Sequence, residues 1–262
     1  MRTVLVFVEG VSGVGKSTMV QRLEEDLRAK GIAVTSYLEG DPENPIDFYS
    51  TAYLPEREHK SICQRYPGER EKIAAHTRDV GGAKLVRYVG PGGPLFSQPL
   101  QGELEQREFC YKPARPIPVK EYQAACQKVW QDFSTSLGED QGIFLFDGSL
   151  LHHPLNDLMR NYHLTAGQSA HHVQGLLRAL GQRQRHIFYL ETQDLAGQLE
   201  QARKERGQRP LSPKQLAFWE ARYQRDQTVL ASLEEKCCRY DVTPGWDLAR
   251  KQMAETLLEC FM

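Results

Sequence analysis

The chain has 262 residues, with 33 Lys and Arg against 34 Asp and Glu and a formal net charge of −1. This length suffices for one large α/β domain with a sizeable insertion, and the balanced charge gives no electrostatic support for a nucleic-acid partner. The six cysteines show no C-x-x-C spacing, and no stretch approaches the roughly 20 apolar residues that span a bilayer, so we expect a cytoplasmic protein with reduced thiols and without a zinc knuckle or membrane contact.

The first 40 residues predict a strand, a helix and a second strand. Residues 3–8 are a continuous β-branched and aromatic run, which is typical of a strand buried on both faces of a parallel sheet. A helix follows, with apolar residues at helical spacing: Met19, Val20, Leu23 and Leu27. Gly31 predicts its end, and residues 32–38 predict the second strand.

Between residues 45 and 118 this regular pattern dissolves. The stretch holds most of the prolines of the chain, including the Gly-Pro-Gly-Gly-Pro cluster at 90–94. A loop of this length inside a compact domain is usually functional or carries small elements of its own. We therefore predict a largely irregular and helical insertion, with short helices at 56–64 and 68–76 and a strand at 84–89.

Regular elements return in the second half of the chain. Helices are expected at 119–137, after Thr165 as a cap, and from Ser212 and Pro213 as N-cap and first helical residue. Further apolar runs predict strands at 142–147, 186–191 and 237–242 and a closing helix at 246–261. Strands that alternate with helices predict an α/β fold, a doubly wound parallel five-stranded sheet, in a single domain over residues 1–262.

The strongest chemical signal is the pattern G-x-x-x-x-G-K-S at residues 10–17, which lies directly between a predicted strand and a predicted helix. Its glycines let successive backbone N–H groups face an anion, and the helix N-terminus adds partial positive charge. Lys16 is expected to reach the β- and γ-phosphates and Ser17 to offer its hydroxyl to Mg²⁺. We predict binding of ATP, with GTP left open, by Gly10, Ser12, Gly13, Val14, Gly15, Lys16, Ser17 and Thr18.

Three carboxylates follow predicted strands, at the edge of the sheet where ligands gather. Asp147 ends the strand at 142–147 and is expected to hold Mg²⁺ together with Ser17, directly or through water. Glu39 and Asp41 follow the second strand, and either could accept the proton of an attacking hydroxyl. The alternative for this pair is acidic turn residues in solvent. We favour Glu39 because it directly abuts the strand.

Arg203, Arg206 and Arg209 repeat every three residues. A solvated charged helix face is one explanation, but Gly207 and Pro210 predict that the helix ends within this segment. Several guanidinium groups on a mobile loop suit phosphoryl transfer, in which charge builds on the transferring oxygens. We predict a lid at about 200–212 that carries these arginines.

Two pairs of adjacent histidines, His152-His153 and His171-His172, suggest metal binding at first sight. Adjacent side chains on one element point in different directions, and no Cys or acid completes a site. We predict that these histidines lie at the surface or behind the site rather than on a metal.

With these residues in place, the chain resembles the P-loop nucleoside and nucleotide kinases, especially the deoxynucleoside kinase and thymidylate kinase group. The resemblance rests on residues 10–17, Glu39, Asp147-Gly148-Ser149 and residues 203–209. It implies that these segments supply the phosphate loop, the general base, an acidic motif and the lid over ATP. Gly148 departs from the group, which usually has Arg there, and the insertion matches no segment of it.

The resemblance implies an ATP- and Mg²⁺-dependent phosphotransferase that acts on a hydroxyl or phosphate of a small molecule. A nucleoside or nucleotide is the favoured acceptor, and an antibiotic or another metabolite also fits. The implied catalytic residues are Lys16, Glu39, Asp41, Asp147, Arg203, Arg206 and Arg209. The competing interpretation is an NTPase switch or regulatory ATP-binding module without such an acceptor. The sequence leaves the oligomeric state open, a homodimer included.

Overall fold

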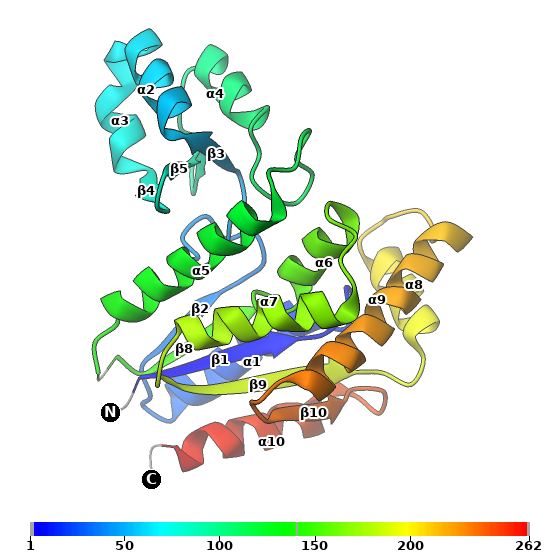
Figure 1. The fold of residues 1–262 in the computed structure, drawn as a ribbon. Coiled ribbons are helices and arrows are strands. Elements are labelled where there is room, and N and C mark those ends of the chain that lie inside the picture. Colours follow the sequence, from blue (N-terminus) through cyan, green and yellow to red (C-terminus); the bar gives the residue numbers. More distant parts are fainter. Residues whose placement is uncertain (1–2, 140, 261–262) are drawn as a thin grey trace.

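The computed structural model describes residues 3–139 and 141–260 and has an α/β fold built on a five-stranded parallel sheet (Figure 1). The strands lie in the order β10-β9-β1-β8-β2, and every neighbouring pair is parallel. Their bounds are β1 (Val4–Glu9), β2 (Val34–Tyr37), β8 (Ile143–Asp147), β9 (Gln184–Glu191) and β10 (Cys237–Asp241). The predicted fold class is therefore confirmed, and each of the five predicted strands is present.

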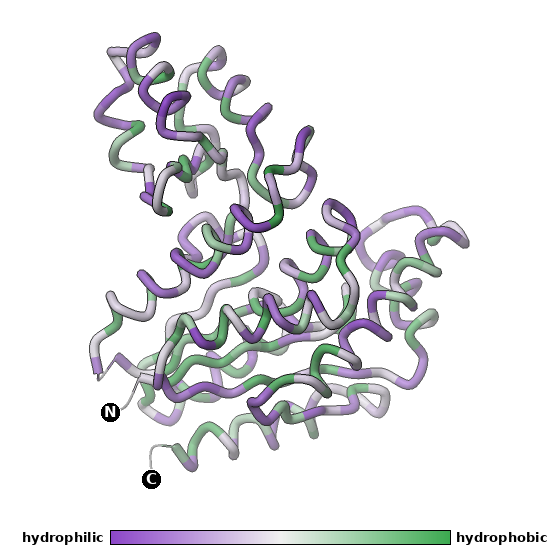
Figure 2. Tube along the Cα trace, viewed as in Figure 1, coloured by the Kyte–Doolittle hydropathy of each residue, from purple (hydrophilic) through white to green (hydrophobic). Residues whose placement is uncertain are grey.

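Helices cover both faces of this sheet. The bounds of the main ones are α1 (Lys16–Ala29), α5 (Val119–Ser136), α7 (Ala166–Ala179), α9 (Pro213–Ser232) and α10 (Trp246–Glu259). Because side chains alternate along a strand, Val4, Val6 and Val8 of β1 pack with α1 and α10, whereas Leu5 and Phe7 pack with α5 and α7. Figure 2 shows the hydrophobic residues gathered on the central strands and the inner sides of these helices.

Two helix starts follow the sequence signals closely. Thr165 and Ser212 each form a capping box. The hydroxyl of the cap residue accepts a hydrogen bond from the backbone N–H three residues on, and the side chain of the Gln at that position accepts one from the backbone N–H of the cap residue. Pro213 occupies the first turn of α9. The two shorter helices near the site are α6 (His152–Arg160) and α8 (Leu195–Glu205).

The insertion differs from the prediction of a largely irregular and helical segment, because it contains a three-stranded antiparallel sheet in the order β3-β5-β4. Its elements are β3 (Thr51–Pro55), α2 (Glu56–Arg65), η1 (Pro67–Glu69), α3 (Arg70–Ala75), β4 (Thr77–Asp79), β5 (Ala83–Arg87), β6 (Val89–Gly90), β7 (Gly93–Pro94) and α4 (Gln98–Glu105). The predicted helices at 56–64 and 68–76 are present as α2 and α3. The predicted strand at 84–89 is present as β5. Strands β3 and β4 escaped prediction because they span only five and three residues, and β3 finds its partner β5 about 30 residues along the chain.

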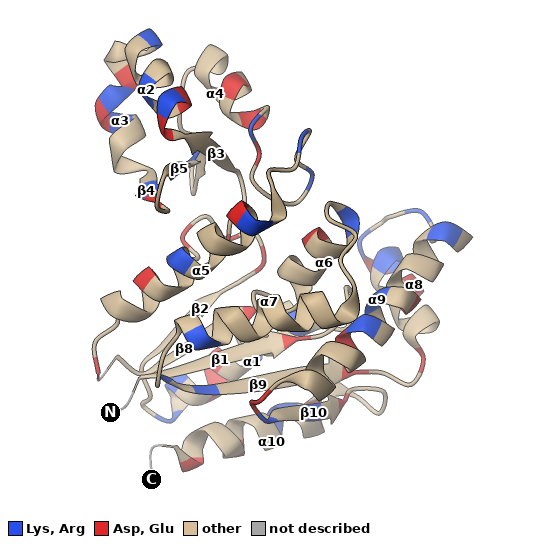
Figure 3. Ribbon diagram, in the orientation of Figure 1, with Lys and Arg blue, Asp and Glu red and all other residues tan. Residues whose placement is uncertain are grey.

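The insertion also has a hydrophobic cluster of its own, which includes Ala52, Leu54, Ile62, Val86 and Leu100. Figure 1 shows it standing apart from the parallel sheet, with α5 between the two. Positive and negative residues are mixed over α2 and α3, whereas α4 carries negative residues only (Figure 3). Among the described residues, no helix is long and apolar enough to cross a membrane. That the whole chain forms one domain with a lid at about 200–212 stays a prediction.

Candidate functional site

The loop at residues 10–17 joins β1 to α1 and depends on glycine at two tight positions. Gly13 and Gly15 have φ values of 79° and 96°, in the left-handed region that side chains disfavour. A Cβ at Gly13 would lie 2.8 Å from the Cβ of Ala202 in α8. A Cβ at Gly15 would lie 2.8 Å from the indole Nε1 of Trp246. The loop is thus held from outside by two elements that come much later in the chain.

Two side chains fasten those elements to the loop backbone. Trp246, the first residue of α10, donates its indole N–H to the carbonyl of Val14 at 3.2 Å. Gln198 of α8 donates to the carbonyl of Gly13 at 2.9 Å. Sequence reasoning missed both residues, because no local pattern marks a side chain that acts across about 200 positions.

The loop opens into a hollow of about 220 Å³, which we name the phosphate hollow after the predicted phosphate-binding residues that line it. The residues that line it are Ser12, Gly13, Gly15, Lys16, Ser17, Thr18, Glu39, Gln198, Gln201, Ala202, Glu205, Arg206 and Trp246. Six of the eight predicted phosphate-binding residues are in this set. The other two, Gly10 and Val14, shape the loop from within: Val14 is fully buried, and a Cβ at Gly10 would lie 2.7 Å from the carbonyl oxygen of Leu190.

Asp147 lies at the carboxyl end of β8 and is fully buried. Its Oδ2 accepts a hydrogen bond from the Ser17 hydroxyl at 2.6 Å, while its Oδ1 has no partner among the described residues. These hard oxygens fit Mg²⁺, which is usually bound through one or two carboxylates plus substrate phosphates. In the described part of the chain, no group of three or more His, Cys, Asp or Glu could hold a metal by itself. That finding is compatible with a metal that arrives with its nucleotide.

Gly148 departs from the kinase pattern for a physical reason. Its φ is 67°, and a Cβ there would lie 3.0 Å from the Cβ of His152 and 3.2 Å from the Cε of Lys16. A long side chain at this position would therefore crowd the lysine of the phosphate loop. Lys16 itself is buried and donates to the carbonyl of Val11 at 3.1 Å.

The structure separates the two candidate bases. Glu39 lines the phosphate hollow, and its carboxylate lies 3.9 Å from Nε2 of His152. Asp41 does not line the hollow, and its Oδ1 accepts the backbone N–H of Glu43 at 2.8 Å. Asp41 therefore serves the turn after β2, and of the two carboxylates only Glu39 lines the hollow.

The arginine segment is only partly at the site. Arg206 follows the end of α8 and lines the phosphate hollow. Arg203 donates its Nε to the backbone carbonyl of Arg209 at 2.6 Å, and neither residue lines the hollow. Lys and Arg gather where α8 passes into the loop before α9 (Figure 3). Recruitment of Arg203 and Arg209 to the site stays a prediction.

A buried carboxyl at the end of β1 was missed by sequence reasoning. Glu9 accepts backbone N–H groups from Leu150 at 2.7 Å and from His152 at 2.9 Å, so it joins β1 to the start of α6. Burial raises the pKa of Glu9 to about 7, against the lowering effect of these bonds and of Lys16. A charged residue directly after an apolar run and directly before the loop was the available signal.

A place at the surface or behind the site was predicted for the histidine pairs. His152 and His172 are both buried, which excludes the surface for these two. Burial, aided by the charge of Lys16, holds the pKa of His152 well below its usual value, so this imidazole is neutral. It packs in a stacked arrangement on Trp219 of α9, with ring centroids 6.0 Å apart.

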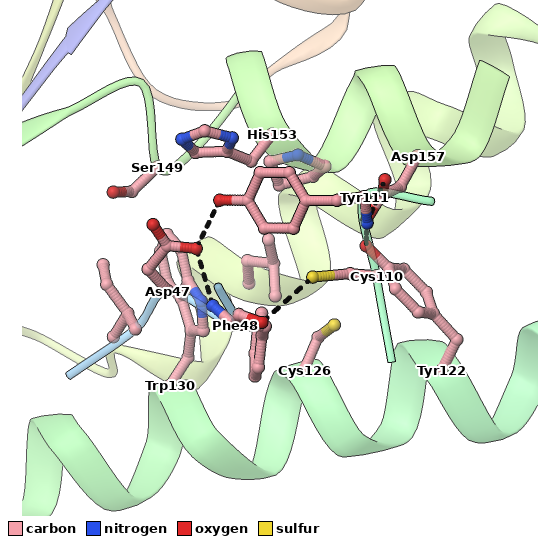
Figure 4. A pocket seen from close by; sticks show the side chains of 13 residues that line it. Asp47, Phe48, Cys110, Tyr111, Tyr122, Cys126, Trp130, Ser149, His153 and Asp157 are labelled. Carbon is pink, nitrogen blue, oxygen red and sulfur yellow. Dashed lines mark hydrogen bonds between the residues drawn. The ribbon is translucent and has the colours of Figure 1, made fainter. Parts of the chain in front are cut away.

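A second, smaller cavity lies on the insertion side (Figure 4). Its nearest link to the phosphate hollow is His153, whose ring packs against that of His152, and Nε2 of His152 lies 3.9 Å from the Glu39 carboxylate. The polar lining of the small cavity comes from four separate segments: Asp47, Tyr111, Ser149, His153 and Asp157. Ser149 lies two residues after Asp147 and accepts a hydrogen bond from the Asn44 side chain at 3.3 Å. No motif in the sequence pointed to this cavity.

No family model and no curated protein matches the chain. Among solved structures, the chain is similar to thymidylate kinase from Candida albicans, with 14% identity, coverage of 98% of this chain and 92% of that chain, and a TM-score of 0.45. It is also similar to shikimate kinase from Acinetobacter baumannii in complex with shikimate, with 12% identity, coverage of 100% and 93%, and a TM-score of 0.38. At these identities and TM-scores, the likenesses carry no inference about substrate or activity.

Proposed function

We propose that this chain is an ATP- and Mg²⁺-dependent phosphotransferase that moves the γ-phosphoryl group to a hydroxyl or phosphate of a small molecule. A nucleoside or nucleotide is the favoured acceptor, with an antibiotic or another hydroxylated metabolite as further candidates. The observation that carries the proposal is the contact between the phosphate loop and Asp147. The Asp147 carboxylate accepts a hydrogen bond from the Ser17 hydroxyl at 2.6 Å, and Ser17 lines the hollow of about 220 Å³.

The residues of this hollow have separate roles in the proposed reaction. Lys16 and the loop N–H groups bind the β- and γ-phosphates of ATP. Ser17 and Asp147 would hold Mg²⁺ together with the phosphates, and the ion would supply positive charge at the phosphate oxygens. Arg206 adds positive charge to the same hollow, where charge develops in the transition state.

The acceptor oxygen attacks the γ-phosphorus in line with the bond to the β–γ bridging oxygen. The new P–O bond forms as the bridging bond breaks, and its electron pair leaves on ADP. Where the acceptor is a hydroxyl, its proton passes to the carboxylate of Glu39, which lines the hollow beside Lys16 and Ser17.

The test uses γ-labelled ATP, Mg²⁺ and a panel of nucleosides, nucleoside monophosphates and hydroxylated antibiotics. Label on one acceptor class, lost in Lys16→Ala, is the expected result. Label released only as free phosphate, or ATP binding without turnover, supports the alternative of an NTPase switch or regulatory ATP-binding module instead.

A further inference from the structure

The backbone of Tyr111 marks the small cavity as unusual. Tyr111 has φ 62°, a left-handed conformation that is uncommon for any bulky residue and persists only where the surroundings fix it. Its N–H donates to Oδ1 of Asp157 at 2.9 Å, and its ring lies 5.1 Å from that of His153. Its hydroxyl donates to Oδ1 of Asp47 at 2.7 Å. The insertion thus holds Tyr111 in a strained backbone conformation, in which its hydroxyl reaches the carboxylate of Asp47.

The two oxygens of that carboxylate differ. Asp47 is only 4% exposed. Its Oδ1 accepts three hydrogen bonds, from the N–H of Phe48 at 2.6 Å, the N–H of Tyr49 at 3.2 Å and the hydroxyl of Tyr111. Its Oδ2 is buried and finds no partner within residues 3–139 and 141–260. Leaving a buried carboxylate oxygen without a hydrogen-bond donor costs free energy. We therefore expect Oδ2 of Asp47 to accept a hydrogen bond from a donor outside the protein.

The cavity at this oxygen has the electrostatics of a hydroxyl site. It measures about 10 Å³, which is room for one water or one hydroxyl group. Figure 4 shows the second oxygen of Asp47 turned to the side of Ser149 and His153. Two carboxylates, Asp47 and Asp157, line the cavity, and none of its described lining residues is Lys or Arg.

The nearest arginine serves the backbone instead. Arg87 donates to the carbonyl oxygens of Asn44 at 3.3 Å and Asp47 at 2.8 Å. It lines a separate small cavity on another side of Asp47, together with Arg78 and His76. A group that enters beside Ser149 and Tyr111 therefore meets the carboxylate of Asp47, without a Lys or Arg among the described lining residues.

The space for the rest of an acceptor lies across Tyr111. A larger hollow of about 350 Å³ shares this residue with the small cavity. Its walls are aromatic and polar: Tyr49, Ser50, Tyr88, Glu105, Glu108, Lys112 and Arg160. Ser50, like Tyr111, has a positive φ, of 49°. Both strained residues of the insertion thus lie on this wall.

We propose that the cavity formed by Asp47, Tyr111, Ser149 and His153 is the acceptor pocket. In this proposal Oδ2 of Asp47 binds a hydroxyl of the acceptor, and the acceptor carries no phosphate group. The inference rests on the proposed function and narrows the acceptor group from a hydroxyl or phosphate to a hydroxyl. A hydroxyl can donate a hydrogen bond to the free oxygen, whereas a phosphate would place its negative charge against the Asp47 carboxylate.

The first experiment offers matched acceptors to the full chain with γ-labelled ATP and Mg²⁺: each nucleoside beside its own 5′-monophosphate, and each hydroxylated antibiotic beside its phosphate ester. Label on the unphosphorylated members alone is the expected result. Label on the phosphorylated members, alone or together with the others, overturns the inference and leaves the phosphotransferase standing. Label on neither set overturns the phosphotransferase, and the inference with it.

The second experiment measures Asp47→Asn with the acceptor found in the first. The amide oxygen keeps the acceptor role of Oδ1, while the amide nitrogen can no longer accept from a hydroxyl, so the acceptor KM is expected to rise at least about tenfold. The KM for ATP should stay within about twofold, because Asp47 does not line the phosphate hollow. An unchanged acceptor KM overturns the inference.

Asp79→Asn is the matched control, since it makes the same change on the exposed β4 strand of the insertion and should leave both KM values unchanged. Tyr111→Phe tests the same pocket without altering the carboxylate and covers the case in which Asp47→Asn fails to fold. Its acceptor KM is expected to rise about threefold to tenfold at constant KM for ATP, because the carboxylate loses its orienting donor. A fall in kcat with both KM values unchanged would show a structural role only and overturn the inference.

Discussion

The phosphate hollow and the small cavity at Asp47 are built in opposite ways. Five of the residues that line the hollow come from the single run at 10–17, whose backbone is fixed by two glycines in the left-handed region. The second draws Asp47, Tyr111 and Ser149 from positions more than 35 residues apart and depends on side-chain hydrogen bonds. The comparison teaches that a site built from the backbone of one loop can be specified by neighbouring residues, whereas a site built from side chains of separate segments is assembled by the fold.

The largest effect is expected on the phosphate side. Lys16→Ala removes the cation that is expected to reach the β- and γ-phosphates, so kcat/KM for phosphoryl transfer should fall at least about 1,000-fold. Lys30→Ala is the control, because Lys30 is exposed after α1 and should change little. A loss below about tenfold for Lys16→Ala would place the phosphate contacts elsewhere.

A pH series tests whether the buried carboxyl behind the phosphate loop acts as the structure indicates. Burial raises the pKa of Glu9 from 4.5 to about 7, so between these values the native state holds a proton that the unfolded state has released. The contribution of Glu9 to stability is full below pH 4.5 and is lost as the pH rises through about 7, a change of about 3 kcal/mol at most.

Urea unfolding of the parent chain and Glu9→Gln at intervals from pH 4.5 to 8 measures this slope. The variant should show a flatter profile, and Glu25→Gln, at an exposed position of α1, should follow the parent. Burial raises the pKa of Asp157, on the insertion side, to about 7 as well, so part of the slope remains in Glu9→Gln. Identical profiles for parent and Glu9→Gln would contradict the assignment.

The outer support of the phosphate loop can be separated from backbone strain. Gly15→Ala and Gly31→Ala both place a side chain at positive φ, but only the first meets the indole of Trp246, and no described atom lies within 4 Å of the second. Gly31→Ala should lower the free energy of unfolding by about 1 kcal/mol, and Gly15→Ala by about 2 kcal/mol more.

Denaturant unfolding gives these free energies, and titration calorimetry gives the ATP affinity. We expect Gly15→Ala alone to weaken ATP binding, by about tenfold, since the loop must shift away from Trp246. Equal losses in the two variants would mean that Trp246 does not shape the loop.

The smallest effect is expected on the insertion side. Tyr111→Phe removes one hydrogen bond to Asp47 and should lower the free energy of unfolding by about 1 kcal/mol. Tyr49→Phe provides the comparison, because that side chain is 42% exposed and its ring packs edge-on against Tyr111. If the two variants unfold at the same denaturant concentration, the Tyr111 hydroxyl is not a structural tie between Asp47 and the chain.

Sequence patterns predicted the parallel sheet well for a reason visible in β1. All of its residues are buried, so an unbroken apolar run was required, and the alternate residues fill the two opposite cores. The helix caps at Thr165 and Ser212 were equally predictable from the sequence, because their hydrogen bonds join residues only three positions apart. In the insertion sheet only β5 was predicted, since β3 spans five residues and pairs with β5 about 30 residues along the chain.

The amino-acid sequence by itself determined the phosphate loop, the carboxylate of Asp147 at the end of β8, and Glu39 at the end of β2. Each of these depends on a strand end or on backbone geometry that a few neighbouring residues specify. Only the tertiary structure decided that Trp246 holds the loop, that Arg206 rather than Arg203 lines the hollow, and that Asp47 presents one free oxygen. These depend on which distant segments pack together, because burial and hydrogen-bond partners are properties of the folded chain and not of any local pattern.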